Sequence, residues 1–193
     1  MQEPNQYLAQ ALKALRRHCG WSLDEAARET GVSKAMLGQI ERGESSPTLA
    51  TLWKIAGGFR TSISYFLAPG GDAGNDTLVR SADAVRQRPA SDQMLIAPLF
   101  PYEPRYGFEW LELTLLPGYV RRSEPHAPGV TEHVTVIRGT MELLIDDAWR
   151  TLAEGSAIRF AADRPHGYRN PGEAPAVFHN LIHYPPGYRP PSA

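Results

Sequence analysis

Residues 34–42 carry polar side chains that can form hydrogen bonds to nucleic acid. A glutamine amide such as that of Gln39 can bind adenine through two hydrogen bonds, and the ammonium group of Lys34 can reach the acceptors of guanine. Arg42 is better suited to a phosphate, which a guanidinium binds as a charge-assisted pair. Ala35 lies among these residues and adds little bulk. If one helix presents them together, this set of side chains predicts contact with DNA.

A capped helix is predicted immediately before these residues. Ser22 is a good N-cap, and Glu25, three positions later, completes a capping box. Gly31 can take the left-handed conformation that ends a helix sharply, and Val32 can pack under the turn that follows. The sequence therefore predicts a short helix between Ser22 and Gly31.

A second helix is predicted to begin at Ser33, which is another good N-cap. Its apolar residues, Met36, Leu37 and Ile40, fall three and four positions apart, and Gly38 falls on the opposite, polar face. Two short helices joined by a tight turn predict a helix-turn-helix, whose second helix enters a DNA groove. A helix hairpin with a merely solvated polar face is the alternative.

Apolar residues at helical spacing on both sides predict three further helices. The upstream helix has its apolar residues at Leu8, Ala11, Leu12 and Leu15. Ser46 is predicted to cap a downstream helix with Pro47 at its first position, and Ser62 to begin a short last helix. Gly57 and Gly58 should each destabilise the end of the downstream helix by about 1 kcal/mol.

Phosphate contacts are predicted from single groups, because the charge of the N-terminal segment is weak. Residues 1–67 hold 8 Lys and Arg against 6 Asp and Glu, a net charge of +2, and the rest of the chain holds 12 against 15. The candidates for phosphate contact are Arg16, Arg42, Lys54 and the helix N-termini at Ser22 and Ser33.

These five helices closely resemble the lambda-repressor-like helix-turn-helix domain of the XRE family of bacterial regulators. The matching residues, within 7–67, are Ser22, Leu23, Ala27, Gly31, Val32, Ser33, Leu37, Gln39, Ile40, Glu41, Arg42, Gly43, Pro47, Leu52, Ile55 and Ala56. The resemblance implies a five-helix, all-α domain that binds double-stranded DNA. Because family members commonly dimerise, it also implies a homodimer on a pseudo-palindromic operator.

The chain is long enough for two domains, since its 193 residues exceed the needs of one small helical unit. A small, polar, glycine-rich segment at 68–77 predicts a flexible linker between a helical domain at 1–67 and a second domain at 78–193. A single cysteine excludes an internal disulfide, and the sequence contains neither a signal peptide nor an apolar stretch that could span a bilayer. We therefore expect a cytoplasmic protein without a membrane partner.

Past the linker, the pattern changes to short apolar runs separated by turn residues. The runs are 78–79, 94–97, 108–116, 132–137, 141–145, 157–160 and 177–182. Short strands at this spacing indicate an all-β sandwich or barrel.

Two segments of this second domain resemble the signature motifs of the cupin superfamily. The matching residues are Gly118, His126, Glu132 and Gly139 in the first motif, and Gly155, Pro165, His166 and Asn170 in the second. The resemblance covers about 106–184 and implies a double-sheet, jelly-roll-type barrel. It also implies a ligand-sensing role, because an XRE-type domain followed by a cupin is a familiar architecture of regulators.

The cupin resemblance also implies candidate metal ligands. Three of the four ligand positions of metal-binding cupins are occupied by His126, Glu132 and His166, whereas the fourth holds Pro128, which cannot bind a metal. Two imidazoles and one carboxylate could still hold a divalent transition metal as a facial triad with open positions. The alternative is a polar pocket that lost its metal and hydrogen-bonds an organic ligand.

Other residues are predicted to line or rim the barrel pocket. They are Trp110, Arg121, Phe160, Tyr168 and His179. Core packing is the alternative for each aromatic residue, and an interface or solvent-facing position is the alternative for His179. Arg105 and Arg121, near the mouth, could attract a carboxylate. His133 should face away from Glu132, because side chains alternate along a strand.

The residues and the two resemblances together predict a transcription regulator, more specifically a repressor, that binds DNA with its helical domain. A small-molecule effector in the barrel would alter barrel contacts and thereby the distance between two recognition helices. One alternative is a metal-dependent dioxygenase or isomerase with an accessory helical domain. Another is a nucleoid or partner-binding module whose barrel serves only for dimerisation.

Overall fold

The structure is a computed structural model that describes residues 4–68, 77–87 and 92–188. The chain divides into two compact units, Met1–Gly70 with Gly187–Ala193, and Gly71–Pro186. Most of the predicted linker, at 69–76, lies outside the described residues. No helix in the part of the chain that the structure describes is long and apolar enough to cross a bilayer.

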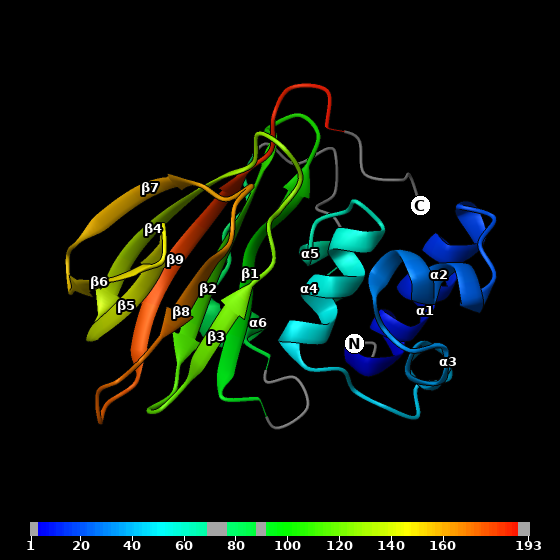
Figure 1. The fold of residues 1–193 in the computed structure, drawn as a ribbon, viewed down its shortest axis with the longest axis horizontal. Coiled ribbons are helices and arrows are strands. Elements are labelled where there is room, and N and C mark those ends of the chain that lie inside the picture. Colours follow the sequence, from blue (N-terminus) through cyan, green and yellow to red (C-terminus); the bar gives the residue numbers. More distant parts are fainter. Residues whose placement is uncertain (1–3, 69–76, 88–91, 189–193) are drawn as a thin grey trace. The chain divides into compact units, whose positions relative to one another are not determined.

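The first unit is built from helices (Figure 1). They are α1 (Pro4–His18), α2 (Leu23–Thr30), α3 (Lys34–Glu41), α4 (Leu49–Gly58) and α5 (Ser64–Leu67). α1 packs against α3 and α5, and α2 packs against α3 and α4. Leu12, Leu15, Leu37, Ile55 and Phe59 are almost fully buried between them. One apolar stripe on each helix therefore builds a shared core.

The caps of α2 and α3 confirm the two short helices predicted from the sequence. Ser22 Oγ accepts a hydrogen bond from Glu25 N, and the Glu25 carboxylate accepts one from Ser22 N. Gly31 follows α2 with a φ of 66°, a left-handed conformation that glycine adopts without strain. Ser33 Oγ accepts a hydrogen bond from Met36 N at the start of α3. Local hydrogen bonds and one glycine thus define the turn between the helices.

The start of α4 differs from the prediction. The helix begins at Leu49 with Thr48 as its N-cap, and not at Pro47 after Ser46. Both hydroxyl residues are competent caps, but Thr48 is the one whose side chain accepts a hydrogen bond from Thr51 N. Pro47 is buried ahead of the helix.

The start of α5 also differs from the prediction. The helix begins at Ser64 and not at Ser62, whose hydroxyl lies 3.1 Å from that of Ser64. The N-cap residue, Ile63, makes no side-chain capping bond. Burial of Phe66 and Leu67, rather than a cap, therefore holds this single turn in place.

The two glycines at the end of α4 differ in their surroundings, which corrects the expectation that both simply weaken the helix. A Cβ atom on Gly57 would meet no atom within 4 Å. A Cβ atom on Gly58 would lie 2.6 Å from the carbonyl oxygen of Glu29 and 2.6 Å from Thr30 Cα. The last turn of α2 approaches α4 so closely that only glycine fits at position 58.

The second unit consists of two antiparallel sheets (Figure 1). Its strands are β1 (Met94–Glu103), β2 (Phe108–Leu115), β3 (Val120–Ser123), β4 (Thr131–Arg138), β5 (Thr140–Ile145), β6 (Ala148–Ala153), β7 (Ala157–Ala161), β8 (His166–Arg169) and β9 (Ala176–His183). The first sheet has the strand order β1-β2-β9-β4-β7, and the second has the order β3-β8-β5-β6. A short helix, α6 (Ala82–Val85), precedes β1.

Most predicted strands are present, but three strands and α6 were missed. The sequences of β3, β6 and β8 are VRRS, AWRTLA and HGYR, which are short or polar and show no clear apolar run. These segments are strands because they pair with neighbouring strands. For example, β8 pairs with β3 on one side and with β5 on the other. The predicted strand at 78–79 is wrong, since Val79 is 90% exposed and belongs to no strand.

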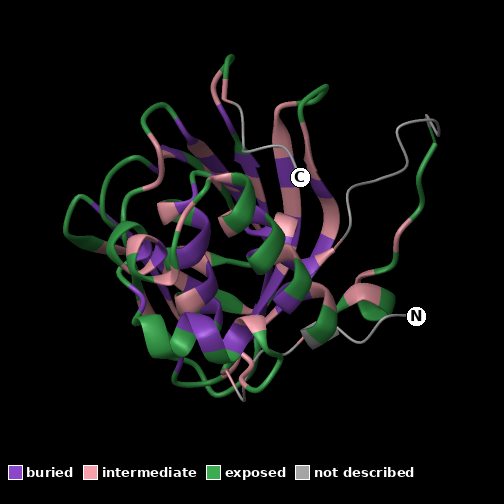
Figure 2. Ribbon diagram, turned by 90° about the vertical axis from the view of Figure 1, so that its right-hand side faces the viewer, coloured by how far each residue is buried: buried purple, intermediate pink, exposed green. Residues whose placement is uncertain are grey.

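The core of the second unit lies between the two sheets. Buried and partly exposed residues alternate along β4, because successive side chains point to opposite faces. Figure 2 shows buried and partly exposed stretches interleaved in the strands that it displays. Leu111, Leu113 and Phe178 of the first sheet and Met141 and Leu143 of the second are all at most 2% exposed. This alternation decides which polar side chains face the interior.

Substitutions at the two glycines of α4 should change stability in opposite directions. Gly57→Ala should raise the free energy of unfolding of the helical unit by about 0.5–1 kcal/mol, because alanine stabilises a helix and meets no clash there. Gly58→Ala must push α2 and α4 apart and should lower it by about 1–3 kcal/mol. Urea unfolding of the full chain, followed by circular dichroism at 222 nm, measures both. Equal effects of the two substitutions would contradict the close approach of α2 to α4.

Candidate functional site

The outer surface of α3 presents the side chains that were predicted to contact DNA. Lys34, Ala35, Gln39 and Arg42 are all exposed. Gly38, which was predicted to lie on the same face, is buried instead. A Cβ atom at position 38 would lie 3.1 Å from Arg42 Nη1, so the guanidinium lies across the place where another side chain would project.

The buried face of α3 is rotated relative to the prediction. Leu37 and Ile40 are at most 1% exposed, whereas Met36, predicted to be apolar core, is 36% exposed. The difference arises because Glu41 turns its carboxylate inward, where its side chain is only 7% exposed. The buried face is therefore centred on Leu37 and Glu41, and it includes Gly38 rather than Met36.

Arg16 of α1 binds this inward carboxylate in a bidentate ion pair. Its Nε and Nη2 atoms donate to the two Glu41 oxygens at 2.6 and 2.9 Å, and its Nη1 donates to the carbonyl oxygen of Trp21 at 2.8 Å. The Arg16 side chain is 15% exposed. In place of the predicted phosphate contact, the structure gives Arg16 the role of joining α1 to α3 and to the residues before α2.

Two exposed ion pairs engage the cationic side chains of the α3 surface. Lys34 Nζ lies 2.7 Å from an oxygen of Asp24, and Arg42 Nη2 lies 2.7 Å from an oxygen of Glu44. All four side chains are more than half exposed. Ion pairs in such positions contribute about 0–1 kcal/mol, so a phosphate or a base can replace either carboxylate with little loss.

The remaining predicted phosphate contacts are also accessible. Ser22 and Ser33 are exposed at the N-termini of α2 and α3, where free amides and the helix dipole favour an anion. Lys54 lies on the exposed side of α4.

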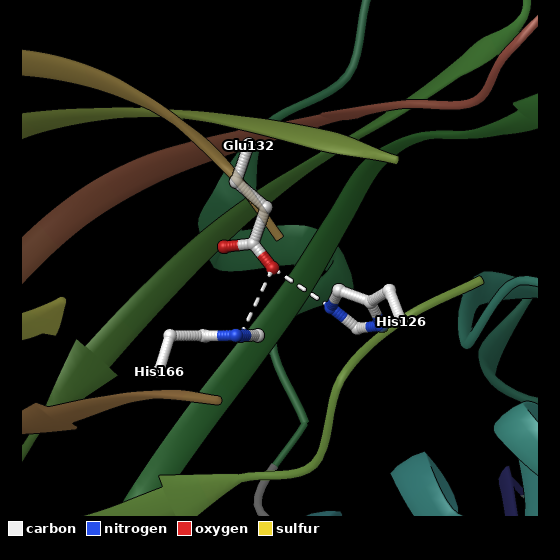
Figure 3. Close-up of side chains that lie close together, drawn as sticks. All are labelled: His126, Glu132 and His166. Atoms are coloured by element: carbon white, nitrogen blue, oxygen red, sulfur yellow. Dashed lines mark hydrogen bonds and ion pairs between the residues drawn. The ribbon is translucent and has the colours of Figure 1, made fainter. Parts of the chain in front are cut away.

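In the second unit, two histidines converge on one carboxylate (Figure 3). Glu132 lies on β4, His166 on β8, and His126 in the segment between β3 and β4. His126 Nε2 lies 2.8 Å and His166 Nε2 lies 3.4 Å from Glu132 Oε1. Glu132 and His166 are each 1% exposed and His126 is 18% exposed. The histidine closest to solvent is therefore His126.

The second oxygen of Glu132 is held by β8 and β9. The Tyr168 hydroxyl and the Asn180 amide both donate to Oε2, the latter at 2.8 Å. Burial raises the pKa of the Glu132 carboxyl, but the hydrogen bonds and charges of His126 and His166 outweigh burial and hold that pKa well below its usual range. Burial, reinforced by the Glu132 charge, raises the pKa of Tyr168 well above its usual value. Near neutral pH, Glu132 is thus an anion and Tyr168 a neutral donor.

The orientation of His166 fits a metal ligand. Its Nδ1 lies 2.9 Å from the carbonyl oxygen of Arg164, which assigns the ring proton to Nδ1 and leaves the Nε2 lone pair for the cluster. One ligand atom from each of His126, Glu132 and His166 lies within 4.8 Å of the others. This donor set suits a divalent first-row transition metal, which would supply a Lewis acid with open positions. Pro128 is exposed and provides no fourth ligand.

A proton competes with a metal for the same cluster. Burial lowers the pKa of His166, but the hydrogen bond and charge of Glu132 outweigh burial and raise that pKa. In a metal-free cluster, a proton on Nε2 would therefore bridge His166 and Glu132. The cluster can accordingly hold either a metal or a polar organic ligand that hydrogen-bonds to the imidazoles.

Three of the other predicted pocket residues lie near the cluster. The Phe160 ring centroid is 5.4 Å from that of His166. Tyr168 binds Glu132 directly, and Arg121 is its Cα partner in the pairing of β3 with β8, so both project from the same face. Burial lowers the pKa of the Arg121 guanidinium.

Trp110 and His179 lie on the opposite face of the first sheet. Glu132 pairs with Ile182 in β9, and His179, three positions away, faces the other side of the sheet. The Trp110 and His179 rings contact each other, with centroids 5.6 Å apart. The structure therefore separates both from the cluster with which they were predicted to share a pocket. His133, adjacent to Glu132 on β4, falls on this outer face as expected.

Asn180 anchors the carboxylate and was not predicted from the sequence. A polar residue within the apolar run of β9 was the signal that could have identified it. Its Oδ1 atom is buried and has no hydrogen-bond partner among the described residues. An unpaired acceptor beside Glu132 is a further polar group that a ligand could bind.

Comparisons with known proteins identify both units. Residues 12–66 match a helix-turn-helix family model, and residues 111–184 match a cupin domain model. The chain is 48% identical over 185 residues to the HTH-type transcriptional regulator SutR of Escherichia coli (strain K12), covering 96% of this chain and 99% of that protein. A solved HTH_3 family transcriptional regulator from Vibrio cholerae is 47% identical, with a TM-score of 0.79 over 94% of this chain and 97% of that one. The antitoxin HipB of Escherichia coli (strain K12) is 32% identical over 57 residues, which are 30% of this chain and 65% of HipB.

A helix-turn-helix unit followed by a cupin unit defines a DNA-binding transcriptional regulator. The chain belongs to the XRE-type family of helix-turn-helix transcriptional regulators that carry a cupin domain. The two relatives that are 47–48% identical over nearly the whole chain, SutR and the Vibrio cholerae protein, are transcriptional regulators, so the protein is a regulator and not an enzyme. The two resemblances found in the sequence are thereby confirmed.

Metal content tests the histidine–carboxylate cluster. After incubation with divalent first-row metals and removal of excess, we expect mass spectrometry to find about one metal per wild-type chain, because three ligand atoms converge. Glu132→Gln should retain at least about tenfold less, since it removes the central anion. His133→Gln is the matched control on the opposite face and should retain the wild-type amount. Equal retention by wild type and Glu132→Gln would contradict a metal site and favour the organic ligand.

Proposed function

We propose that the protein is a cytoplasmic repressor that binds a pseudo-palindromic operator as a homodimer, with α3 in the major groove of each half-site. Gln39 and Lys34 contact base edges, and the small side chain of Ala35 permits close approach. The phosphate contacts come from Arg42, Lys54 and the helix N-termini at Ser22 and Ser33.

The observation that carries this proposal is the exposed donor face of α3 on a rigid support. Lys34, Gln39 and Arg42 are exposed, while the opposite face is fixed by Leu37 and by the ion pair of Glu41 with Arg16. Because the backbone of α3 is already fixed, little conformational entropy of the helix is lost when its donors bind DNA. Two such helices on one operator would give a specific affinity of about 10⁻⁸–10⁻¹¹ M.

α1 to α5 form the five-helix arrangement of lambda-repressor-like domains, and the two sheets form a double-sheet, jelly-roll-type barrel. The order of the helices and the antiparallel pairing of the sheets support this part of the proposal.

The cupin unit supplies control by a small molecule. Its ligand contacts the cluster of His126, Glu132 and His166 and is enclosed by neighbouring side chains, namely Arg121, Phe160 and Tyr168. The buried charge of Glu132 and the unpaired Asn180 acceptor support a polar ligand there. Ligand binding shifts the population of dimers toward a spacing of the α3 helices that fits the operator poorly, and repression is relieved.

Selection of bound duplexes from a random library tests the DNA-reading role. We expect the wild-type protein to recover an inverted repeat with half-sites about 10 base pairs apart. Gln39→Ala should relax the preference at one position of each half-site, which corresponds to about 1–3 kcal/mol of lost discrimination. Arg42→Ala should recover the same motif but bind every sequence more weakly, because phosphate contacts are independent of sequence.

Lys13→Ala, an exposed substitution on α1, serves as the control and should change neither motif nor affinity. The assignment fails if Gln39→Ala and Arg42→Ala lose specificity equally, or if the wild-type protein recovers no common motif.

A further inference from the structure

A cavity of about 300 Å³ lies between the β5–β6 hairpin, β7 and the segment that joins β7 to β8. β7 is the edge strand of the first sheet and β6 that of the second. Its lining includes three arginines, one aspartate and two apolar residues, namely Arg150, Arg159, Arg164, Asp146, Ile158 and Phe160. Pockets for small ligands begin at about this volume.

The positive charges of this cavity outnumber the negative ones. Asp146 is the only acidic residue in the lining, and it pairs with Arg164 at 3.0 Å through side chains that are both more than half exposed. Within the described ranges, neither Arg150 nor Arg159 has a carboxylate at ion-pair distance. Two arginines of the lining are therefore not neutralised by a carboxylate of the described residues. They are Arg150 and Arg159; Arg159 pairs with His133, so its side chain starts from the outer face of the sheet and borders the cavity at the free edge of β7.

We propose that this arginine pocket, formed around Arg150, Arg159 and Arg164, binds a small anionic molecule through a phosphate or carboxylate group. A guanidinium donates two parallel hydrogen bonds to either group, and several guanidinium groups around one cavity fix its position. Ile158 and Phe160 supply apolar surface for the rest of the molecule.

The two arginines that the sequence suggested for an anionic ligand are less suitable. Arg105 lies between β1 and β2, with its guanidinium carbon 5.3 Å from the centre of the Tyr106 ring. Arg121 interacts electrostatically with the Glu132 carboxylate, whose negative charge disfavours a second anion beside it. The arginine pocket contains no such buried carboxylate.

The arginine pocket adjoins the histidine–carboxylate cluster through two of its lining residues. Phe160 is the Cα partner of Glu132 in the pairing of β4 with β7, and its ring lies 5.4 Å from the His166 ring. Ile145 is the Cα partner of His166 in the pairing of β5 with β8. An anion that displaced Phe160 would therefore disturb His166. On the proposed function, we place the anionic part of the effector in this pocket.

Titration calorimetry of the full chain tests the pocket with two probes, inorganic phosphate and succinate. The titrations are run at low, constant ionic strength with chloride as the reference anion, because salt screens exposed charges. We expect saturable binding of at least one probe to the wild-type protein. Arg150→Gln and Arg159→Gln should each weaken it about 10- to 100-fold, the range expected for the loss of charge-assisted hydrogen bonds.

Arg138→Gln is the matched control, since Arg138 is exposed at the end of β4 and does not line the cavity. Unchanged affinity in this variant supports a defined site. Absence of saturable binding for both probes would overturn the inference, as would equal weakening in Arg138→Gln.

A parallel titration of operator DNA with and without the bound probe separates this inference from the proposed function. If a probe binds in an arginine-dependent way but leaves operator affinity unchanged, the pocket is supported. That result would also refute control of DNA binding by the probe anion. Operator binding by a protein that binds neither probe refutes the pocket and leaves the DNA-reading role intact.

Discussion

The ion pair between Arg16 and Glu41 is the interaction on which the proposed DNA-reading surface of α3 depends. It joins α1 to α3 through two hydrogen bonds, and a third bond from Arg16 reaches the backbone of Trp21 just before α2. With both side chains largely buried, loss of one partner would leave an unpaired charge at a cost of about 3–5 kcal/mol. The pair therefore fixes the rotation of α3 and thereby decides which of its residues face solvent.

The cupin unit places a second carboxylate inside the protein and uses it differently. Glu132 is surrounded by donors from two strands and one loop, and two of those donors are histidines that can exchange a proton for a metal or a ligand. Whereas Glu41 holds two helices in place, Glu132 forms a site whose occupancy can change. Beside it, the arginines that line the neighbouring cavity provide charge of the opposite sign. A fixed carboxylate in one unit and an adjustable one in the other suit the function proposed here, in which a DNA-binding regulator responds to a small molecule.

The features that the sequence predicted correctly are those set by contacts a few residues apart. Ser22, Glu25, Gly31 and Ser33 act through hydrogen bonds or backbone conformation within one turn of helix, so their roles can be derived from spacing alone. The inward turn of Glu41 depends on a partner 25 residues away, which periodicity does not reveal.

The same distinction holds in the second unit. Apolar strands were predicted from composition, but β3, β6 and β8 are strands because their neighbours pair with them. The outward position of Trp110 and His179 follows from strand register, and the need for glycine at position 58 follows from the approach of another helix. The cluster of His126, Glu132 and His166 was anticipated from family resemblance, and Asn180 became evident only in the structure.

Retention of sheared genomic DNA from the source organism tests the central claim, sequence-specific reading by α3, most directly. Purified protein is mixed with the fragments at moderate salt, with and without a small-molecule extract of the cells, and the retained fragments are sequenced. The account predicts a small set of fragments that share an inverted repeat in at least one of the two conditions. Uniform retention in both conditions, or retention in neither, would contradict it.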